Sequence, residues 1–261
     1  MTVSPDDKLT DDRFLGGALS VLQPAAGYRA GLDAVLLAAA ARGQMAAGGR
    51  VLDAGAGVGV VGLAIAAGVA GVQVTLVEID PALAELARRN AERNGLGDRV
   101  RVAVADIAGG GYILHAAETE SVLTPANFDH VVTNPPFYEI GSGTTSPHRI
   151  KAAAHQMQTG GLDRWIAFLA TAATSDGTLT MIHRADIVGA VLATLQGRFG
   201  RIRIRPVHSR SDAPAGRILV TAIKGSRAAL ELRPALILQD ASGRYLPDVE
   251  DVLRHGAAIA V

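Results

Sequence analysis

A glycine-rich turn and two later acids are the residues in this sequence that could hold a ligand. Residues 51–59 read VLDAGAGVG, an apolar run that leads into glycines at alternate positions: Gly55, Gly57 and Gly59. Because glycine lacks a Cβ, the backbone of such a turn can approach a ligand closely. Glu78 and Asp106 end the next two apolar runs. At one edge of an open α/β sheet, such carboxylates can accept hydrogen bonds from ribose hydroxyls and from an exocyclic adenine amine, so the spacing predicts a bound nucleoside.

Asp53 indicates which nucleoside cofactor the turn favours. Residues 57–62 also match the Gly-x-Gly-x-x-Gly fingerprint of dinucleotide-binding proteins, so an NAD-dependent dehydrogenase is one alternative. A carboxylate two residues before Gly55 would repel a pyrophosphate, whereas it suits a ligand with an ammonium and a sulfonium group. S-adenosylmethionine is such a ligand. The competing interpretation of each acid alone is a helix cap or a surface carboxylate.

The tetrapeptide Asn134-Pro135-Pro136-Phe137 ends another apolar run. A base amine conjugated with its ring is a poor nucleophile, and two acceptors that hold its N–H groups favour a pyramidal nitrogen aimed at a methyl group. The Asn134 side-chain oxygen and the Pro135 carbonyl can be these acceptors, on a backbone that two prolines restrict. Phe137 or Tyr138 can stack on a planar substrate. The alternative is a loop with an Asx-type turn and buried aromatic side chains.

Alternating strand and helix patterns must position these residues. A helix is expected over 30–42, and another follows Asp80 as N-cap, with Pro81 at its first position and Gly95 as its stop. Strands are expected over 50–53, 72–77, 100–105, 130–133 and 178–182, which indicates parallel βαβ units of an α/β fold. Further strands over 201–207, 217–224 and 230–239 should finish the sheet in antiparallel pairing, and 107–127 looks like an insertion.

Composition narrows the class of protein. The 261 residues include no cysteine, which excludes disulfides, thiolate zinc sites and cysteine nucleophiles. Lys plus Arg and Asp plus Glu both total 25, so no global basic field attracts nucleic acid. The seven histidines show no metal-ligand spacing, so no metal is expected. With 49% hydrophobic residues the chain should fold as one domain over residues 1–261.

One stretch raises the question of a membrane span. Residues 54–77 carry no charge and are long enough to cross a bilayer. Six glycines in this window favour two strands and one buried helix instead. The N-terminal residues lack the pattern of a secretory signal, so we expect no membrane partner and a cytoplasmic protein.

The motifs together resemble class I S-adenosylmethionine-dependent methyltransferases of the Asn-Pro-Pro-Phe/Tyr group. Residues 12–37, 206–224 and 233–246 resemble the bacterial tRNA(Val) adenine-37 N6-methyltransferase family in particular. The resemblance implies a Rossmann-like, mostly parallel sheet of seven strands, with helices on both faces and an antiparallel C-terminal hairpin. It also implies a helical segment over 1–45 that covers the cofactor site, a catalytic core over 46–261, and Tyr28 or Gln23 beside the cofactor. The chain departs from the family pattern around His155, where Ala154 and Gln156 replace an arginine and an acid.

Two further features bear on partners and packing. Arg201, Arg203 and Arg205 should point the same way on a strand, and with Arg198 and Arg210 they could contact RNA phosphates. The alternative is a solvated edge strand that resists aggregation. Trp165 and Phe168 are spaced as core residues of a helix.

These observations predict N6-methylation of adenine in tRNA or another structured RNA, with S-adenosylmethionine as cofactor. The same turn would also suit methylation of an rRNA guanine or of a protein glutamine. O-methylation of a small molecule is a weaker alternative, because a hydroxyl does not use two acceptors. A cofactor-binding module without turnover is the alternative from another class.

Overall fold

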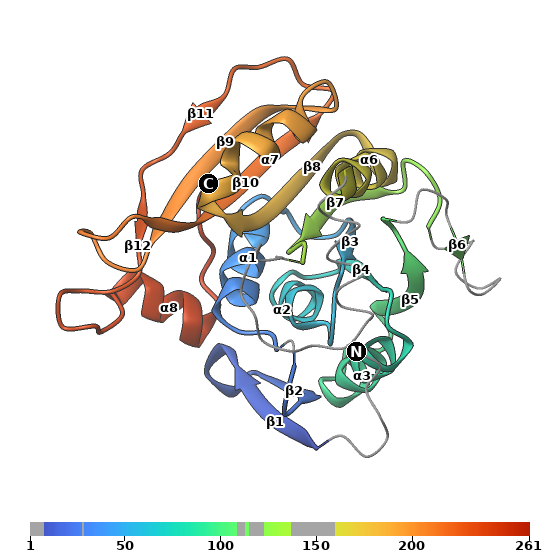
Figure 1. Cartoon of the computed structure of the whole chain (residues 1–261). Helices are drawn as coiled ribbons and strands as arrows, with labels where there is room; N and C mark the ends of the chain where they lie inside the picture. Colours follow the sequence, from blue (N-terminus) through green and yellow to red (C-terminus); the bar gives the residue numbers. More distant parts are fainter. Residues whose placement is uncertain (1–7, 28, 109–112, 115–122, 137–159) are drawn as a thin grey trace.

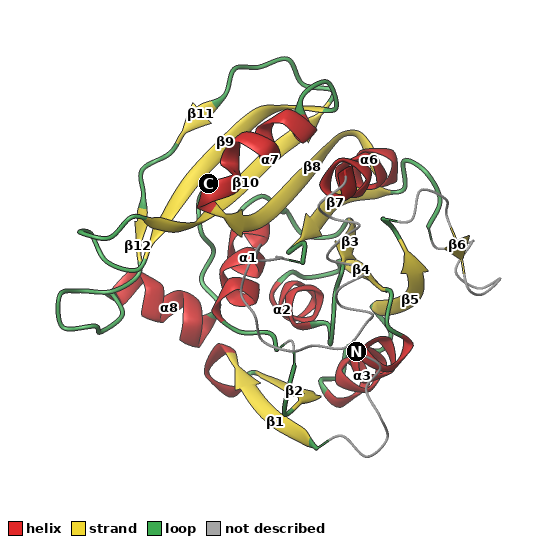
Figure 2. Ribbon diagram, in the orientation of Figure 1, coloured by secondary structure: helices red, strands yellow, loops and turns green. Residues whose placement is uncertain are grey.

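The protein is built around one mixed β-sheet with helices packed on both of its faces (Figures 1 and 2). The computed structural model describes residues 8–27, 29–108, 113–114, 123–136 and 160–261. Within these ranges the sheet has the strand order β11-β9-β10-β8-β7-β3-β4-β5-β6, and β12 also pairs with β9. Its long strands are β3 (Arg50–Ala54), β4 (Gln73–Glu78), β5 (Val100–Asp106), β7 (Phe128–Thr133), β8 (Ala173–Arg184), β9 (Phe199–His208) and β10 (Ala215–Lys224).

The α/β architecture is the expected one. Strands β5, β4, β3, β7 and β8 pair in parallel, and β10 runs antiparallel to both β8 and β9. The resemblance implies seven strands, whereas the described part of the sheet has ten. The additional three are two residues long: β6 (Ile113–Leu114), β11 (Glu231–Leu232) and β12 (Leu236–Ile237).

The expectation of one antiparallel strand over residues 230–239 is wrong. The segment forms β11 and β12, and both pair with β9 in parallel. Pro234 lies between them, and since proline has no N–H to donate, it interrupts the ladder.

Two hydrophobic clusters lie on the two faces of the sheet. The first contains Leu36, Leu63 and Leu86, from α1 (Leu32–Arg42), α2 (Val60–Gly68) and α3 (Pro81–Arg93). It also includes Val252 of α8 (Pro247–His255). The second contains residues of α6 (Leu162–Ala172) and α7 (Val188–Leu195). Successive residues of β3, Val51 and Leu52, belong to different clusters, as the pleat of a strand buried on both faces requires.

The predicted start and stop of α3 are confirmed. The Asp80 carboxylate accepts hydrogen bonds from the backbone N–H groups of Ala82 at 2.8 Å and Leu83 at 3.4 Å, and Pro81 occupies the first turn. Gly95 follows the helix at a φ of 66°, a left-handed conformation that favours glycine.

The expectation that the N-terminal segment is helical is also wrong for the described residues before α1. Instead of being helical throughout, the segment forms an antiparallel hairpin of β1 (Leu9–Phe14) and β2 (Leu19–Pro24) before α1 begins. Leu19 and Val21 are buried while Ser20 and Leu22 are half-buried, so this segment follows the two-residue period of a strand.

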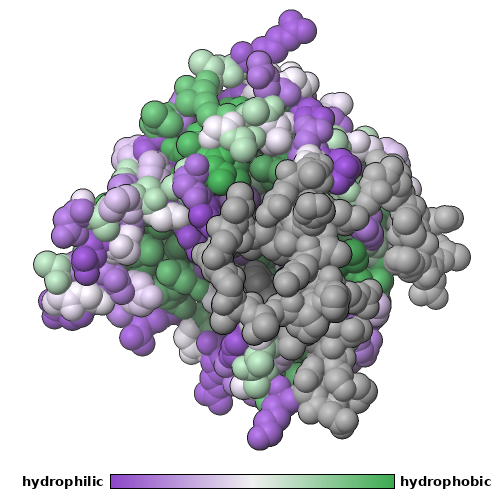
Figure 3. Space-filling view, in the orientation of Figure 1, coloured by the Kyte–Doolittle hydropathy of each residue, from purple (hydrophilic) through white to green (hydrophobic). Residues whose placement is uncertain are grey.

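The uncharged residues 54–77 contain the end of β3, the nine-residue helix α2 and most of β4, as predicted. Among the helices of the described ranges, none is long and apolar enough to cross a membrane. On the face drawn in Figure 3, apolar surface gathers near α7 and hydrophilic residues surround it.

Candidate active site

The predicted ligand-binding residues meet at the carboxyl edge of the sheet. Asp53, Glu78 and Asp106 lie at the ends of β3, β4 and β5, and Asn134 directly follows β7. Ala54 of β3 is in register with Val77 on one side and with Thr133 on the other. The chain passes from β3 outward to β4 and β5, and then returns to place β7 on the opposite side of β3. Ligands of open α/β sheets bind at such a reversal of strand order.

The glycine turn needs its glycines. Gly55, Gly57 and Gly59 have φ angles of 74°, 56° and 92°, which side chains rarely adopt. A Cβ on Gly55 would lie 2.9 Å from Cζ2 of Trp165, and one on Gly59 would lie 2.9 Å from Cδ1 of Leu76. Because these positions carry no side chains, the backbone of the turn itself forms the surface that a ligand would contact.

Asp53 is almost completely buried at the base of this turn. Its side chain is 1% exposed, and Oδ2 accepts a hydrogen bond from the N–H of Gly62 at 2.9 Å. Burial raises the pKa of Asp53 to about 7, and the charge of Glu78 adds to the rise, while the Gly62 bond opposes it. A buried carboxylate of this kind is stabilised by a cation.

Glu78 fixes the shape of the turn. Oε2 accepts a hydrogen bond from Gly57 N–H at 2.8 Å, and Oε1 accepts one from Asp80 N–H at 2.9 Å. Burial raises the pKa of Glu78, although backbone donors from Asp80, Gly57 and Ile79 oppose that rise. Each carboxylate oxygen has a second lone pair, so Glu78 can still accept bonds from ligand hydroxyls.

Asp106 combines a local turn with a position at the carboxyl edge of the sheet. Its Oδ1 accepts a hydrogen bond from Ala108 N–H at 2.9 Å, which is the local arrangement of an Asx turn. Its place at the end of β5 is the predicted one, and its role toward a ligand stays a prediction.

The turn after β7 is described as far as Pro136. Pro135 is buried, and Asn134 and Pro136 are half-buried. The predicted aromatic contacts Phe137, Tyr138 and Tyr28 lie outside the described residues, as do Ala154 and Gln156.

Trp165 has a role that sequence reasoning missed. It packs in the core as predicted, but its indole Nε1–H also donates to Thr133 Oγ1 at 2.9 Å. The Thr133 hydroxyl in turn donates to the Ala54 carbonyl at 2.9 Å. Trp165 thus touches Gly55 and supports the residue just before Asn134, so one side chain links both halves of the site. A buried tryptophan N–H needs an acceptor, which is the signal that could have found this role.

Gln23 makes contacts within the protein that the sequence did not predict, and Ile79 was not singled out from the sequence. Gln23 is buried, its Nε2 donates to Asp12 at 2.7 Å, and its Oε1 accepts from Ala30 N–H at 3.0 Å. Its polar groups therefore hold the chain before α1, and its place beside a cofactor stays a prediction. Ile79, beside Glu78, is 56% exposed and offers apolar surface next to the carboxyl end of β4.

The arginines of β9 lie apart from this crevice. Three strand positions separate β9 from β7, and Arg201 is near the start of β9, at the opposite edge of the sheet. Arg203 pairs with Glu231 at 3.2 Å, and Arg205 donates to the Ala260 carbonyl at 2.6 Å. Arg201 is the exposed member of the three. Across the described residues, no three His, Asp or Glu side chains form a group that could hold a metal ion.

Comparison with known proteins decides the family. The model of the methyltransferase small domain family matches residues 34–172, more than half of the chain and all four strand ends of the crevice. The chain belongs to this family. It is therefore an S-adenosylmethionine-dependent methyltransferase.

Individual relatives agree with this assignment. The crystal structure of a predicted O-methyltransferase from Agrobacterium tumefaciens is 33% identical, with a TM-score of 0.69, and the match covers 88% of this chain and 99% of that one. A tRNA1(Val) (adenine(37)-N6)-methyltransferase from Porphyromonas gingivalis W83 is 29% identical over 91% of both chains. The enzyme of that name from Yersinia pestis Pestoides F is 29% identical over 76% of this chain and 75% of its own.

Proposed function

We propose that this methyltransferase methylates N6 of an adenine in tRNA. The observation that carries the proposal is the Asn134-Pro135 turn at the end of β7, beside the glycine turn of β3 at the reversal of strand order. The two relatives named as tRNA adenine-N6 methyltransferases, which match over most of the chain, support the same acceptor.

The residues at the crevice fit S-adenosylmethionine. We propose that Asp53 attracts the cationic end of the cofactor, because burial disfavours the charge of its carboxylate and a cationic ligand would stabilise that charge. In this proposal the backbone of Gly55, Gly57 and Gly59 borders the cofactor. The Glu78 carboxylate accepts hydrogen bonds from the ribose hydroxyls, and the Asp106 carboxylate accepts one from the adenine amine. Ile79 covers the base, and Tyr28 flanks the cofactor from the N-terminal side. The cofactor supplies an electrophilic methyl group when it is bound.

Asn134 and Pro135 would act on the acceptor amine. In this proposal the Asn134 side-chain oxygen and the Pro135 carbonyl accept the two N–H groups and hold the nitrogen lone pair toward the methyl group. The amine proton becomes acidic as the nitrogen is alkylated, so this arrangement needs no strong general base. Pro136 restricts the turn, and Phe137 or Tyr138 stacks on the base after it has left its own stack.

We propose one methyltransferase domain over residues 1–261, in which residues 1–45 cover the cofactor site and 46–261 form the catalytic core. We propose RNA contact by Arg201, with Arg203 and Arg205 in a supporting role because both already have intramolecular partners. A tRNA acceptor would place the activity in the cytoplasm.

The test is transfer of a labelled methyl group from S-adenosylmethionine into tRNA, rRNA and protein fractions, followed by nucleoside and amino-acid analysis. N6-methyladenosine in tRNA is the expected product. Label in rRNA guanosine, in protein glutamine or on a hydroxyl would replace the proposed acceptor. Asn134→Ala should abolish transfer and leave S-adenosylhomocysteine binding within about twofold of wild type, because Asn134 is proposed to hold the acceptor. Retained turnover in this variant would contradict the role of Asn134.

A further inference from the structure

Asn90 of α3 and Asn94, the residue that directly follows α3, hold the N-terminal hairpin. Asn90 Oδ1 accepts a hydrogen bond from Leu22 N–H at 2.8 Å, and its Nδ2 donates to the Leu22 carbonyl at 3.0 Å. Asn94 repeats the pattern with Ser20, at 2.9 Å for the bond that it accepts and 2.8 Å for the bond that it donates. Each side-chain amide therefore pairs with both backbone groups of one residue, as a neighbouring strand would.

This pairing completes the open edge of β2. On its other side, β2 is paired with β1. A hairpin of two strands is marginally stable alone, and an open edge exposes unpaired backbone groups. The two asparagines satisfy those groups at alternate residues, which are the residues of a strand that face the same way.

The two asparagines differ in the second bond that each Nδ2 donates. Asn94 Nδ2 donates to the Asn90 carbonyl at 2.7 Å, whereas the second acceptor of Asn90 lies in the glycine turn. Asn90 Nδ2 donates to the carbonyl of Val58 at 3.0 Å, and Val58 stands between Gly57 and Gly59 in the glycine turn. Asn90 is 0% exposed, and these three bonds use both of its amide hydrogens and its carbonyl oxygen. One buried side chain thus joins the hairpin to the turn.

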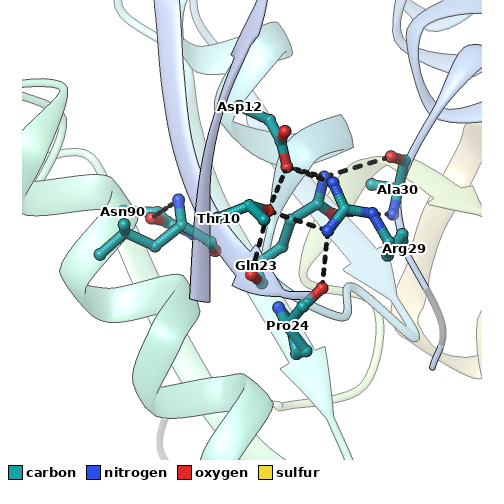
Figure 4. Close-up of polar contacts among 8 residues, drawn as sticks. Thr10, Asp12, Gln23, Pro24, Arg29, Ala30 and Asn90 are labelled. Carbon is teal, nitrogen blue, oxygen red and sulfur yellow. Dashed lines mark hydrogen bonds and ion pairs between the residues drawn. The ribbon is translucent and has the colours of Figure 1, made fainter. Parts of the chain in front are cut away.

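The hairpin is itself tied to the segment that leads into α1. Figure 4 shows Arg29 donating to Asp12, Thr10 and the Pro24 carbonyl, at 2.6, 2.8 and 2.8 Å. Gln23, next to Leu22, joins the same network through Asp12 and the backbone of Ala30 (Figure 4). The contacts therefore link the glycine turn through Asn90 and β2 to Pro24, Arg29 and Ala30.

We propose that Asn90 is a positioning residue that couples cofactor binding to the N-terminal hairpin. Its amide donates to the Val58 carbonyl and so fixes the orientation of the glycine turn. The same amide also pairs with Leu22 and so keeps the hairpin in place. Coupling of this kind is reciprocal, so cofactor bound at the turn stabilises the docked hairpin, and a loosened hairpin weakens the cofactor site. The inference rests on the proposal that the glycine turn binds the cofactor.

The experiment compares Asn90→Ala with Asn94→Ala, which loses the equivalent hairpin contacts and keeps the Val58 contact. S-adenosylhomocysteine binding is measured by calorimetry on the full chain, and a thermal melt checks that each variant folds. Asn90→Ala should raise the Kd about tenfold or more, because a buried carbonyl in the turn loses its donor. Asn94→Ala should stay within about twofold of wild type. With cofactor saturating, kcat of the Asn90 variant should remain near wild type while KM for the cofactor rises.

Hydrogen exchange at the Leu22 amide provides the second readout. In wild type and in Asn94→Ala, S-adenosylhomocysteine should slow this exchange, and in Asn90→Ala it should not. If Asn90→Asp, which keeps an acceptor for Leu22 but has no amide hydrogens to donate, binds the cofactor like wild type, the Val58 contact has no role. Equal effects of the two alanine variants on Kd would also overturn the proposal. Asp53→Asn separates failure of the coupling from failure of the cofactor site. If both the Asn90 variants and Asp53→Asn bind S-adenosylhomocysteine like wild type, the glycine turn is not the cofactor site. If only the Asn90 variants do, the coupling alone is refuted.

Discussion

Replacing Asp53 with Asn should stabilise the cofactor-free enzyme above neutral pH and weaken its binding of cofactor. Burial raises the pKa of Asp53 from 3.8 to about 7, so the folded state holds this proton more tightly than the unfolded state does. The stability that the protonated group contributes is complete below pH 3.8 and is lost as the pH rises through 7. Asparagine keeps the shape and an acceptor for Gly62 N–H but does not ionise.

The size of the effect follows from the shift. One pKa unit corresponds to ~1.4 kcal/mol, so a shift of about three units corresponds to about 4 kcal/mol between acidic and alkaline conditions. The side chain is 1% exposed, so solvent screens it little. We therefore expect the difference in the free energy of unfolding, Asp53→Asn minus wild type, to increase by up to about 4 kcal/mol between pH 4 and pH 8.

The assay is denaturant unfolding of the cofactor-free wild type and Asp53→Asn across this pH range. Other titrating groups are common to the two proteins, so their contributions largely cancel in the difference. A difference that does not change with pH would refute the reasoning. Cofactor binding gives the matching test, because a cationic ligand requires the carboxylate. Between pH 5.5 and 7, wild-type affinity should fall toward tenfold per unit as the pH falls, whereas Asp53→Asn should bind weakly and with little pH dependence.

Three further changes test the remaining parts of the site. Trp165→Phe keeps the apolar packing but loses the donor to Thr133, so we expect about 1 kcal/mol less stability in denaturant unfolding and a larger loss in kcat than in cofactor affinity. Gly59→Ala forces a Cβ onto a φ of 92°, so it should lose about 1–2 kcal/mol or more of stability, whereas Gly97→Ala, whose Cβ would have only an ordinary contact at 3.8 Å, should lose none. Arg201→Ala should weaken tRNA binding and lower the slope of log affinity against log salt by about 1, and an unchanged slope would remove Arg201 from the RNA surface.

The sequence predicts the crevice well because short-range rules determine its parts. Glycines at alternate positions after a strand require positive φ angles, and an Asp-Pro pair starts a helix by capping it. Parallel strands bring their carboxyl ends to one edge, so the acids that end β4 and β5 and the turn that ends β7 are placed once the strands are known. The roles of these residues toward cofactor and acceptor stay predictions.

The parts that the sequence did not predict depend on partners distant in the chain. Residues 19–22 have the two-residue period of a strand, but nothing within residues 9–24 indicates that Asn90 and Asn94 will pair with the second edge of β2. Trp165 has the spacing of a core residue, and only the position of Thr133 across the sheet gives its N–H a polar role. In both cases a buried polar group had to find a partner, and the partner lies in another element. A sequence can therefore indicate that a buried asparagine or tryptophan needs a hydrogen-bond partner, but it does not identify that partner. In this enzyme the partners lie in the glycine turn and at the end of β7.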